Sequence, residues 1–195
     1  MSDSARALRR AVIWVAALNL AYFFVEFGVA RAIASVALFA DSIDFLEDAS
    51  VNFLVLLALG WTVRKRAMVG LVLAALLLVP GIATAWMAWS KFNDPVAPAE
   101  LPMTLAGLGA LAVNVTCAYL LVKVRNVAGS LSRAAFLSAR NDAYANGAII
   151  LAAAVTVFWP SAWPDLIVGI GIFLLNLGAA HEVFEAARRE AGHRP

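Results

Sequence analysis

Six long apolar runs account for most of this chain. They cover residues 11–30, 33–63, 67–90, 101–122, 131–158 and 164–187. About 20 apolar residues in a helix cross the hydrocarbon core of a bilayer, so each run is long enough to span it. Within lipid such runs must be helical, because an open strand leaves its backbone hydrogen-bonding groups unpaired. The sequence therefore predicts an all-α membrane protein, built as a bundle of six transmembrane helices.

The composition indicates that lipid is the main solvent of the folded chain. Hydrophobic residues make up 63% of the 195 residues and charged residues 14%, whereas soluble domains are about half apolar and a quarter charged. This length has room for one domain, so residues 1–195 are expected to form a single transmembrane domain. We expect no C-terminal soluble domain after residue 187 and no nucleic-acid partner. Because Cys117 is the single cysteine, no disulfide can form within the chain.

The positions of Lys and Arg predict how the bundle sits in the membrane. Short loops rich in these residues stay in the cytoplasm. Counted between the runs, one side of the membrane has only Arg31 and Lys91. The other side collects Arg6, Arg9, Arg10, Arg64, Lys65, Arg66, Lys123, Arg125, Arg133, Arg188, Arg189 and Arg194. Both termini are therefore expected in the cytoplasm, and the expected location is a bacterial inner (plasma) membrane.

Acidic residues inside the apolar runs give the strongest indication of function. A carboxylate at the centre of a helix in lipid costs about 2.5–3.5 kcal/mol on insertion scales. Such residues therefore face a cavity or a partner, and by default they mark a pathway for ions or protons. The acidic residues in question are Glu26, Asp41, Asp44, Glu47, Asp48 and Asp142.

Asp44 and Asp48 form the most informative pair. They are four residues apart, so they share one helix face about one turn apart. Two ionised carboxylates so placed repel each other, and a divalent cation between them removes that repulsion. Without metal, at least one should hold a proton, because burial and a like charge both disfavour the ionised form. Asp41 lies on nearly the same stripe and Glu47 lies about 100° from Asp48, which makes both secondary candidates.

The fifth apolar run offers a second set of oxygen donors. Ser138, Asp142 and Asn146 recur every four residues and line one helix face, and Asn141 stands beside Asp142. At a rise of about 1.5 Å per residue, Asp142 reaches a depth similar to that of Asp44, near the middle of the membrane. We therefore predict a metal site formed by Asp44, Asp48 and Asp142, completed by Ser138, Asn141 or Asn146.

A purely structural interpretation stays open for some of these residues. Asp142 can instead pair with Arg140 or Arg133, which would neutralise it without any metal. Asn19 and Glu26 in the first run are either neighbours of the ligands or polar groups that hold the helices together.

Two segments resemble the cation diffusion facilitator family of divalent-metal transporters. Residues 19–26 are similar to the Asn/Phe/Glu pattern of that family's first helix. Residues 34–48 are similar to its Ser-x-Ala-Leu-x-x-Asp stretch and the His/Asp-x-x-x-Asp metal motif that follows, at Asp44 and Asp48. Asp142 and Asn146 match the corresponding motif of the fifth helix. The resemblance implies a six-helix fold and the exchange of metal ions for protons, usually exporting metal from the cytoplasm.

Two departures from the family pattern matter. Ser138 stands where the family has His or Asp, and the family's metal-binding C-terminal domain has no counterpart in this sequence. A homodimer would therefore have to form through the membrane helices. The alternative to a transporter is a membrane subunit, structural or regulatory, that does not transport.

The expected activity is transport and not catalysis. The sequence has no His-Glu-x-x-His and no Gly-x-Ser-x-Gly motif, so we expect no enzyme and no cofactor, with divalent metal ions, protons and the lipid bilayer as partners. A site of oxygen donors without His or Cys favours Mn²⁺, Mg²⁺ or Fe²⁺ over Zn²⁺.

Overall fold

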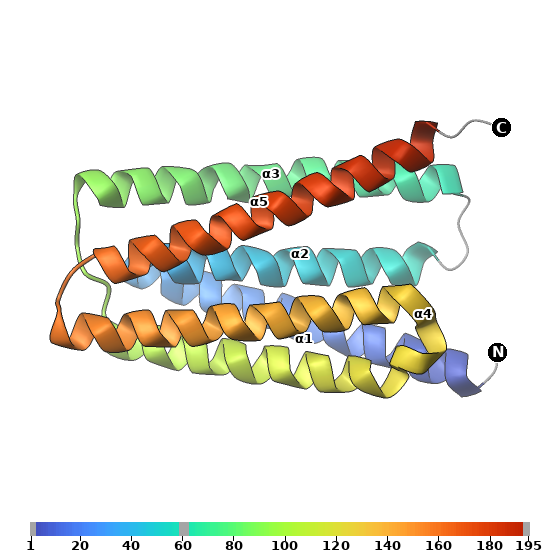
Figure 1. The fold of residues 1–195 in the computed structure, drawn as a ribbon, viewed down its shortest axis with the longest axis horizontal. Coiled ribbons are helices and arrows are strands. Elements are labelled where there is room, and N and C mark those ends of the chain that lie inside the picture. The colour runs from blue at the N-terminus through green and yellow to red at the C-terminus, as the bar shows by residue number, and fades with distance from the viewer. Residues whose placement is uncertain (1–2, 59–62, 193–195) are drawn as a thin grey trace.

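The protein is a bundle of long helices that run lengthwise beside one another (Figure 1). The computed structural model describes the backbone of residues 3–58 and 63–192, and side chains mainly within 6–53, 79–123 and 141–177. No strand occurs in these backbone ranges. The assigned helices are α1 (Asp3–Ile33), α2 (Val36–Ala58), α3 (Val63–Asn93), α4 (Glu100–Phe158) and α5 (Trp163–Gly192).

The helix α4 contains two of the predicted spans. It is assigned as one helix of 59 residues, yet its chain folds back on itself, so that a light-green arm and an orange arm run in opposite directions (Figure 1). These arms correspond to the predicted runs 101–122 and 131–158. When the two arms of α4 are counted as separate segments, the predicted all-α membrane bundle of six helices is confirmed.

Several predicted boundaries are wrong. Residues 123–130 were expected as a linker and are assigned helix within α4; the stretch has no proline, the residue that most firmly stops a helix. Residues 64–66 were also expected to separate two helices but fall in the first turn of α3. Lys and Arg are good helix formers, so a basic stretch at the membrane surface can continue a helix.

The turn between α1 and α2 falls later than expected. The run predicted to begin at residue 33 instead starts as α2 at Val36, because α1 continues to Ile33. Ala34 has a positive φ of 52°, and the Ser35 N–H donates to the Ala30 carbonyl at 3.0 Å. This is the arrangement in which a left-handed residue ends a helix. It allows α2 to turn back along α1 after two residues.

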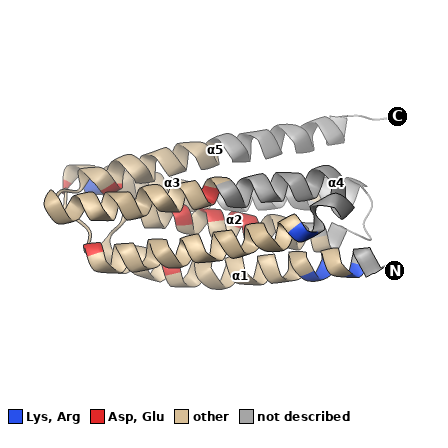
Figure 2. Cartoon of the chain, turned by 60° about the horizontal axis from the view of Figure 1, so that its bottom comes forward, with Lys and Arg blue, Asp and Glu red and all other residues tan. Residues whose placement is uncertain are grey.

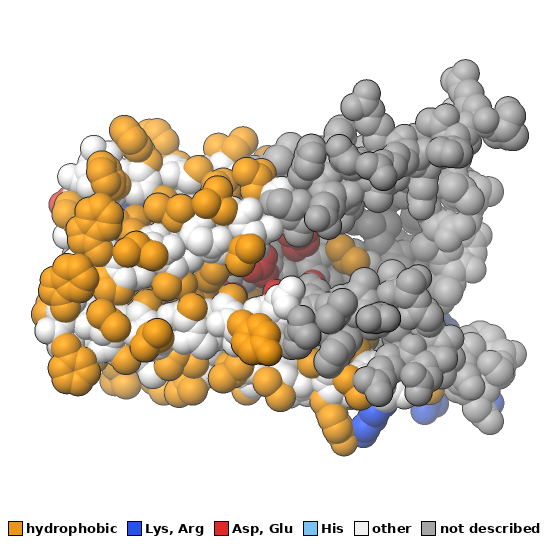
Figure 3. Space-filling model, in the orientation of Figure 1, with side chains coloured by type: hydrophobic (Ala, Val, Ile, Leu, Met, Phe, Trp, Pro, Cys, Tyr) orange, Lys and Arg blue, Asp and Glu red, His pale blue; other side chains and the backbone are white. Residues whose placement is uncertain are grey.

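Small apolar side chains let the helices pack closely. The main core cluster joins residues of α1, α2, both arms of α4 and α5: Ala30, Ala37, Leu38, Phe39, Ala40, Ile43, Met103, Ala106, Ile149, Ala152, Ala153 and Ile172. Alanine is common in it, as expected where helices approach each other within lipid. Large apolar side chains such as Phe24, Trp86 and Leu175 are exposed instead, and hydrophobic groups cover the described surface in Figure 3.

Length and composition agree with a membrane location. Among the described residues, three helical stretches are long and apolar enough to cross a bilayer, namely Arg6–Ile33, Glu100–Lys123 and Asn141–Phe158. Trp163–Leu177 is a shorter apolar stretch. The start of α1 and the end of α5 lie at the same end of the bundle (Figure 1). Both termini therefore share one side, while their cytoplasmic placement stays a prediction.

Candidate functional site

The helix α2 carries most of the interior acids. It contacts each of the other four helices, so it is the central element of the bundle. Asp41, Asp44, Glu47 and Asp48 all lie within its single helical span. Acidic positions mark its middle in Figure 2, and Figure 3 shows acidic side chains inside a hollow midway along the bundle.

Exposure changes along α2. Asp41 and Ser42 are fully buried, whereas Asp44, Glu47 and Asp48 are partly exposed. These three acids follow the buried start of α2 along the chain, in the direction of the end where α1 starts and α5 ends (Figure 1). Burial is thus complete at the start of α2 and incomplete at the three acids that follow it.

Asp142 of α4 joins the acids of α2 across the bundle. It interacts electrostatically with Asp48, Asp41 and Glu47, and Asp44 in turn interacts with Asp142. The structure thus brings together Asp44, Asp48 and Asp142, which were predicted as one group from separate runs. The two secondary candidates, Asp41 and Glu47, belong to the same electrostatic cluster.

These acids do not form a closed metal cage in this conformation. Among the side chains that the structure describes, no three His, Cys, Asp or Glu groups converge closely enough to hold one metal ion. The side chain of Ser138 lies outside the described residues. Asn141 is exposed on α4 next to Asp142. The arrangement can attract a divalent cation, but shorter distances between the carboxylates would be needed to ligate it.

Asn146 links α2 to both arms of α4 through hydrogen bonds. It is fully buried, where its Nδ2 donates to Asp41 Oδ2 at 2.6 Å. Its Oδ1 accepts a hydrogen bond from Asn114 Nδ2 at 3.0 Å. Asn114 lies on the first arm of α4 and Asn146 on the second, so this chain of hydrogen bonds ties α2 to both arms. Asn146 thus lies next to Asp41, a member of the acidic cluster, and its role as a ligand stays a prediction.

A second polar chain leads to Asp48. Asn19 of α1 is fully buried and its Nδ2 lies 3.5 Å from Asp48 Oδ2, a long hydrogen bond. Its Oδ1 accepts from the thiol of Cys117 at 3.6 Å. Asn52, one turn further along α2, donates to the Asp48 backbone carbonyl at 2.8 Å. Asn19 thus lies beside a predicted ligand, which is the first of the two roles left open for it.

Glu26 is the most deeply placed acid of α1. It is fully buried, and neither its carboxyl oxygens nor Asp41 Oδ1 meets a donor group while both acids are ionised. A proton on either acid lets the two carboxyls hydrogen-bond to each other. Glu26 and Asp41 are electrostatic neighbours. Buried polar atoms without partners are rare in native proteins. This second pair extends the acidic interior from the hollow toward the buried start of α2.

Sequence reasoning missed the contribution of the fourth apolar run. Asn114 and Cys117 were not singled out as site residues. Asn114 is nevertheless connected to Asp41 through Asn146, and Cys117 is connected to Asp48 through Asn19. The signal was present for Asn114, because an amide inside an otherwise apolar span needs a polar partner. Cys117 gave no such signal, since a buried thiol behaves as a small apolar group.

Comparison with known proteins agrees with these features. Residues 12–190 match the family described as the cation efflux transmembrane domain. Two curated relatives, from Yersinia pestis and Yersinia pseudotuberculosis serotype I (strain IP32953), are both named "Zinc transporter ZitB". Each is 27% identical to this chain over 176 residues, covering 80% of this chain and 56% of the relative.

The chain spans only a little more than half the length of these two relatives. Both relatives are bacterial, in keeping with a bacterial plasma membrane as the location. The family match covers nearly all of the chain, including α2 and both arms of α4. This protein is therefore an integral membrane protein of the cation efflux family.

Proposed function

We propose that this protein transports divalent metal cations across the membrane, with Asp44, Asp48 and Asp142 as the ligands. The observation that carries the proposal is the group of three carboxylates from two helices, which are partly exposed and interact electrostatically with one another. Isolated acids at this depth would be costly, and a bound divalent cation would offset their mutual repulsion. Ser138 or Asn141 would complete the ligand set.

Transport would proceed by alternating access coupled to protons. Carboxylates that bind metal must be ionised, so metal binding displaces protons and reprotonation favours release. In cells this exchange would export metal from the cytoplasm. The positions of the basic residues predict that both termini lie on that side of the membrane. Asn146 and Asp41 would keep α2 and α4 in register during the cycle, because the hydrogen bond between their side chains forms without any metal ion.

The oxygen donors of the proposed site decide which divalent ions it should prefer. The ligand set contains oxygen alone, which suits Mn²⁺, Mg²⁺ or Fe²⁺, whereas both relatives are named as zinc transporters. Three carboxylates can also hold Zn²⁺. Transport of Zn²⁺ and of no other ion in a panel would overturn the preference for harder ions.

The experiment is a flux measurement in proteoliposomes with a panel of divalent ions and an imposed pH gradient. Asp48→Ala should lower flux at least about 100-fold, since loss of groups that merely support a metal ligand costs about 10–100-fold. Asp94→Ala is the matched control, because Asp94 is an exposed acid outside the helices and its loss should leave flux unchanged. Equal flux in wild type and Asp48→Ala would refute the assignment of Asp48.

A second candidate function is that of a membrane subunit that does not transport. The absence of three converging ligands among the described side chains favours it, together with Ser138 at a position where the family has His or Asp. This candidate predicts no flux for any ion from correctly inserted protein, no metal binding by calorimetry, and stable co-purification with a full-length transporter. Flux of any ion that depends on Asp48 would exclude it.

A further inference from the structure

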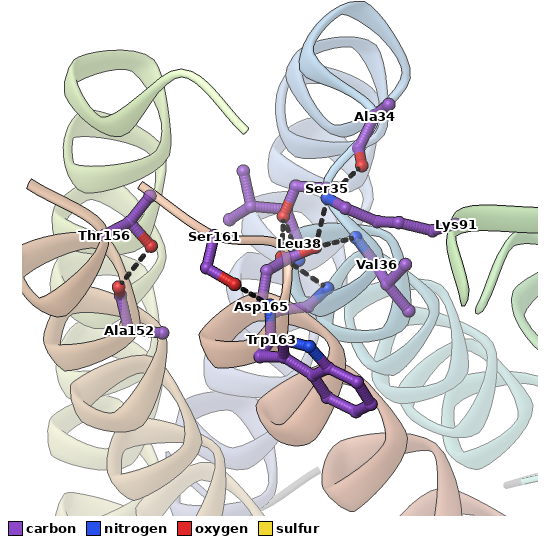
Figure 4. A network of polar contacts seen from close by, with 11 residues as sticks. Ala34, Ser35, Val36, Leu38, Lys91, Ala152, Thr156, Ser161, Trp163 and Asp165 are labelled. Atoms are coloured by element: carbon purple, nitrogen blue, oxygen red, sulfur yellow. Dashed lines mark hydrogen bonds and ion pairs between the residues drawn. The ribbon is translucent and has the colours of Figure 1, made fainter. Parts of the chain in front are cut away.

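The start of α2 is held by an acid from a distant helix. Asp165 in the first turn of α5 is fully buried, and its Oδ2 accepts from the Val36 N–H at 2.9 Å. Its Oδ1 accepts from the Ala37 N–H at 3.1 Å and from the Ser35 hydroxyl at 2.6 Å. Figure 4 shows Asp165 pointing into this first turn. Helices are usually capped by a residue just before them, whereas here the cap comes from another helix.

Ser35 completes the cap from within the local sequence. Its Oγ accepts from the Leu38 N–H at 3.2 Å, and its carbonyl accepts from the Phe39 N–H at 3.1 Å. The first N–H groups of a helix have no partner inside the helix, and all four in α2 are paired here. Two of these donors, the N–H groups of Val36 and Ala37, anchor the start of α2 to Asp165 of α5, and the other two bond to Ser35.

Lys91 connects the same point to α3. Its Nζ lies 2.7 Å from Asp165 Oδ2 and 2.7 Å from the Ala34 carbonyl oxygen, and both charged side chains are almost fully buried. A buried ion pair contributes little net stability, because desolvation offsets the attraction. Its better attested use is to fix one arrangement of helices against others. Here it fixes α3 and α5 on the turn before α2.

Gly169 brings the backbones of α5 and α2 together one turn after Asp165. A Cβ atom at this position would lie 2.7 Å from the Ala37 nitrogen and 2.7 Å from the Val36 carbonyl carbon. Because these are backbone atoms, any side chain here would push the two helices apart. Gly171, on the same helix, has nothing within 4 Å of its Cβ position. We call Ser35, Lys91, Asp165 and Gly169 the capping cluster.

Apolar packing surrounds the capping cluster and closes this end of the bundle. Val36, Ala162 and Leu166 form a buried group with Met87 and Ala88 against it. From Ser35 to Ile43 every residue is buried, whereas the metal-site acids that follow are partly exposed. In this conformation the acids are partly exposed, whereas the segment between them and the α1–α2 turn is fully enclosed.

We propose that Lys91 and Asp165 are positioning residues that hold the bundle closed at this end. The acids of α2 become accessible from this end only when α2 and α5 separate. This inference rests on the proposed transport function. A cation bound to the acids would leave at this end only after the capping cluster opens. The cluster thus sets which side of the membrane the site faces, while Lys91 and Asp165 do not touch the transported ion.

The test measures access to the start of α2 directly. Ser42→Cys, in a Cys117→Ala background, places a thiol at a fully buried position between the capping cluster and the acids. It is treated with a membrane-impermeant thiol reagent applied from the side of the α4–α5 turn. Pro160→Cys, exposed in that turn, identifies that side and sets the maximal rate. With the capping cluster intact, the thiol at position 42 should react far more slowly than the one at position 160.

Opening the capping cluster should raise that rate. Asp165→Asn, Lys91→Met and Gly169→Ala should each speed labelling at position 42 at least about tenfold, a change of about 1.4 kcal/mol in the opening equilibrium. Lys91→Arg, which keeps the charge, and Gly171→Ala, which has space for a methyl group, should leave it slow. Unchanged labelling in all three disrupting variants, with normal gel-filtration profiles, would overturn the proposal.

Transport kinetics separate this role from a merely structural one. Lys91→Met and Gly169→Ala should lower the maximal metal flux while the KM for metal stays within about threefold, a difference of less than 1 kcal/mol in binding. Equal loss of metal binding would mark these residues as parts of the metal site and refute the positioning role. If wild type moves no metal at all, the proposed function fails, but the labelling rates still decide whether the capping cluster closes this end.

Discussion

At the scale of single residues, Ala34 adopts a backbone conformation that disfavours any side chain. Its φ of 52° lies in the left-handed region, which costs L-residues other than Gly, Asn and Asp about 1–2 kcal/mol. Ala34→Gly should relieve this, although glycine also makes the unfolded chain more flexible, so the net gain in stability should be about 0.5–1 kcal/mol. Denaturant unfolding in detergent measures it.

Ala30→Gly supplies the matched control for that prediction. Ala30 is fully buried in the last full turn of α1, where glycine loses both packing and helix propensity. The same change should therefore destabilise the protein at residue 30 and stabilise it at residue 34. A loss of stability in Ala34→Gly would show that the conformation of this turn costs nothing to hold.

Residue identity alone could predict only part of the site. The four-residue spacing of Asp44 and Asp48 fixes their common helix face, and the structure keeps them on one helix. The same spacing rule grouped Asn146 with Asp142, yet Asn146 is hydrogen-bonded to Asp41 and Asn114. Spacing tells which residues share a face but not which neighbouring helix that face meets. The neighbour of each face is decided by how α2 and the two arms of α4 pack together, and no single segment of the sequence contains that information.

At the scale of helices, the hydrophobic pattern located the spans but not their ends. Residues 64–66 and 123–130 are polar enough to suggest linkers, and both are assigned helix. Polarity indicates where a chain leaves the hydrocarbon core, whereas a helix ends only where its backbone groups find other partners. The α1–α2 turn is such a place, because Asp165, Ser35 and Lys91 satisfy its backbone groups.

Close contact between α1 and α4 makes a testable prediction at Gly109. A Cβ atom there would collide with the hydroxyl of Tyr22, which donates to the Ala106 carbonyl at 2.6 Å and whose ring contacts Phe45. Gly109→Ala would displace this ring and break its hydrogen bond, at an expected cost of about 1–3 kcal/mol.

Gly147→Ala is the control for that change, because nothing lies within 4 Å of its Cβ position. It sits on the other arm of the same helix, so both variants remove one glycine from α4. Unfolding by SDS titration should distinguish them, with a lower midpoint for Gly109→Ala alone. Equal midpoints would mean that Tyr22 can move without loss, and that the α1–α4 contact is looser than its geometry suggests.

At the scale of the whole molecule, the two ends of the bundle differ in chemistry. One end holds both termini and the basic residues at the start of α1 (Figures 1 and 2). The other end holds the capping cluster and exposed aromatic side chains on α3 and α5, including Trp89, Phe92 and Trp163. Tryptophan favours the boundary between membrane and water. Among the described residues, the bundle thus has one basic end and one aromatic end.

This asymmetry predicts the topology of the protein in cells. Because Lys and Arg near short loops are retained in the cytoplasm, the terminal end should face inward and the α4–α5 turn outward. Alkaline phosphatase, which folds only outside the cytoplasm, should be inactive when fused to either terminus, whereas a fluorescent protein fused there should be bright. Pro160→Cys should react with an impermeant thiol reagent in intact cells. Active phosphatase at either terminus would reverse the orientation.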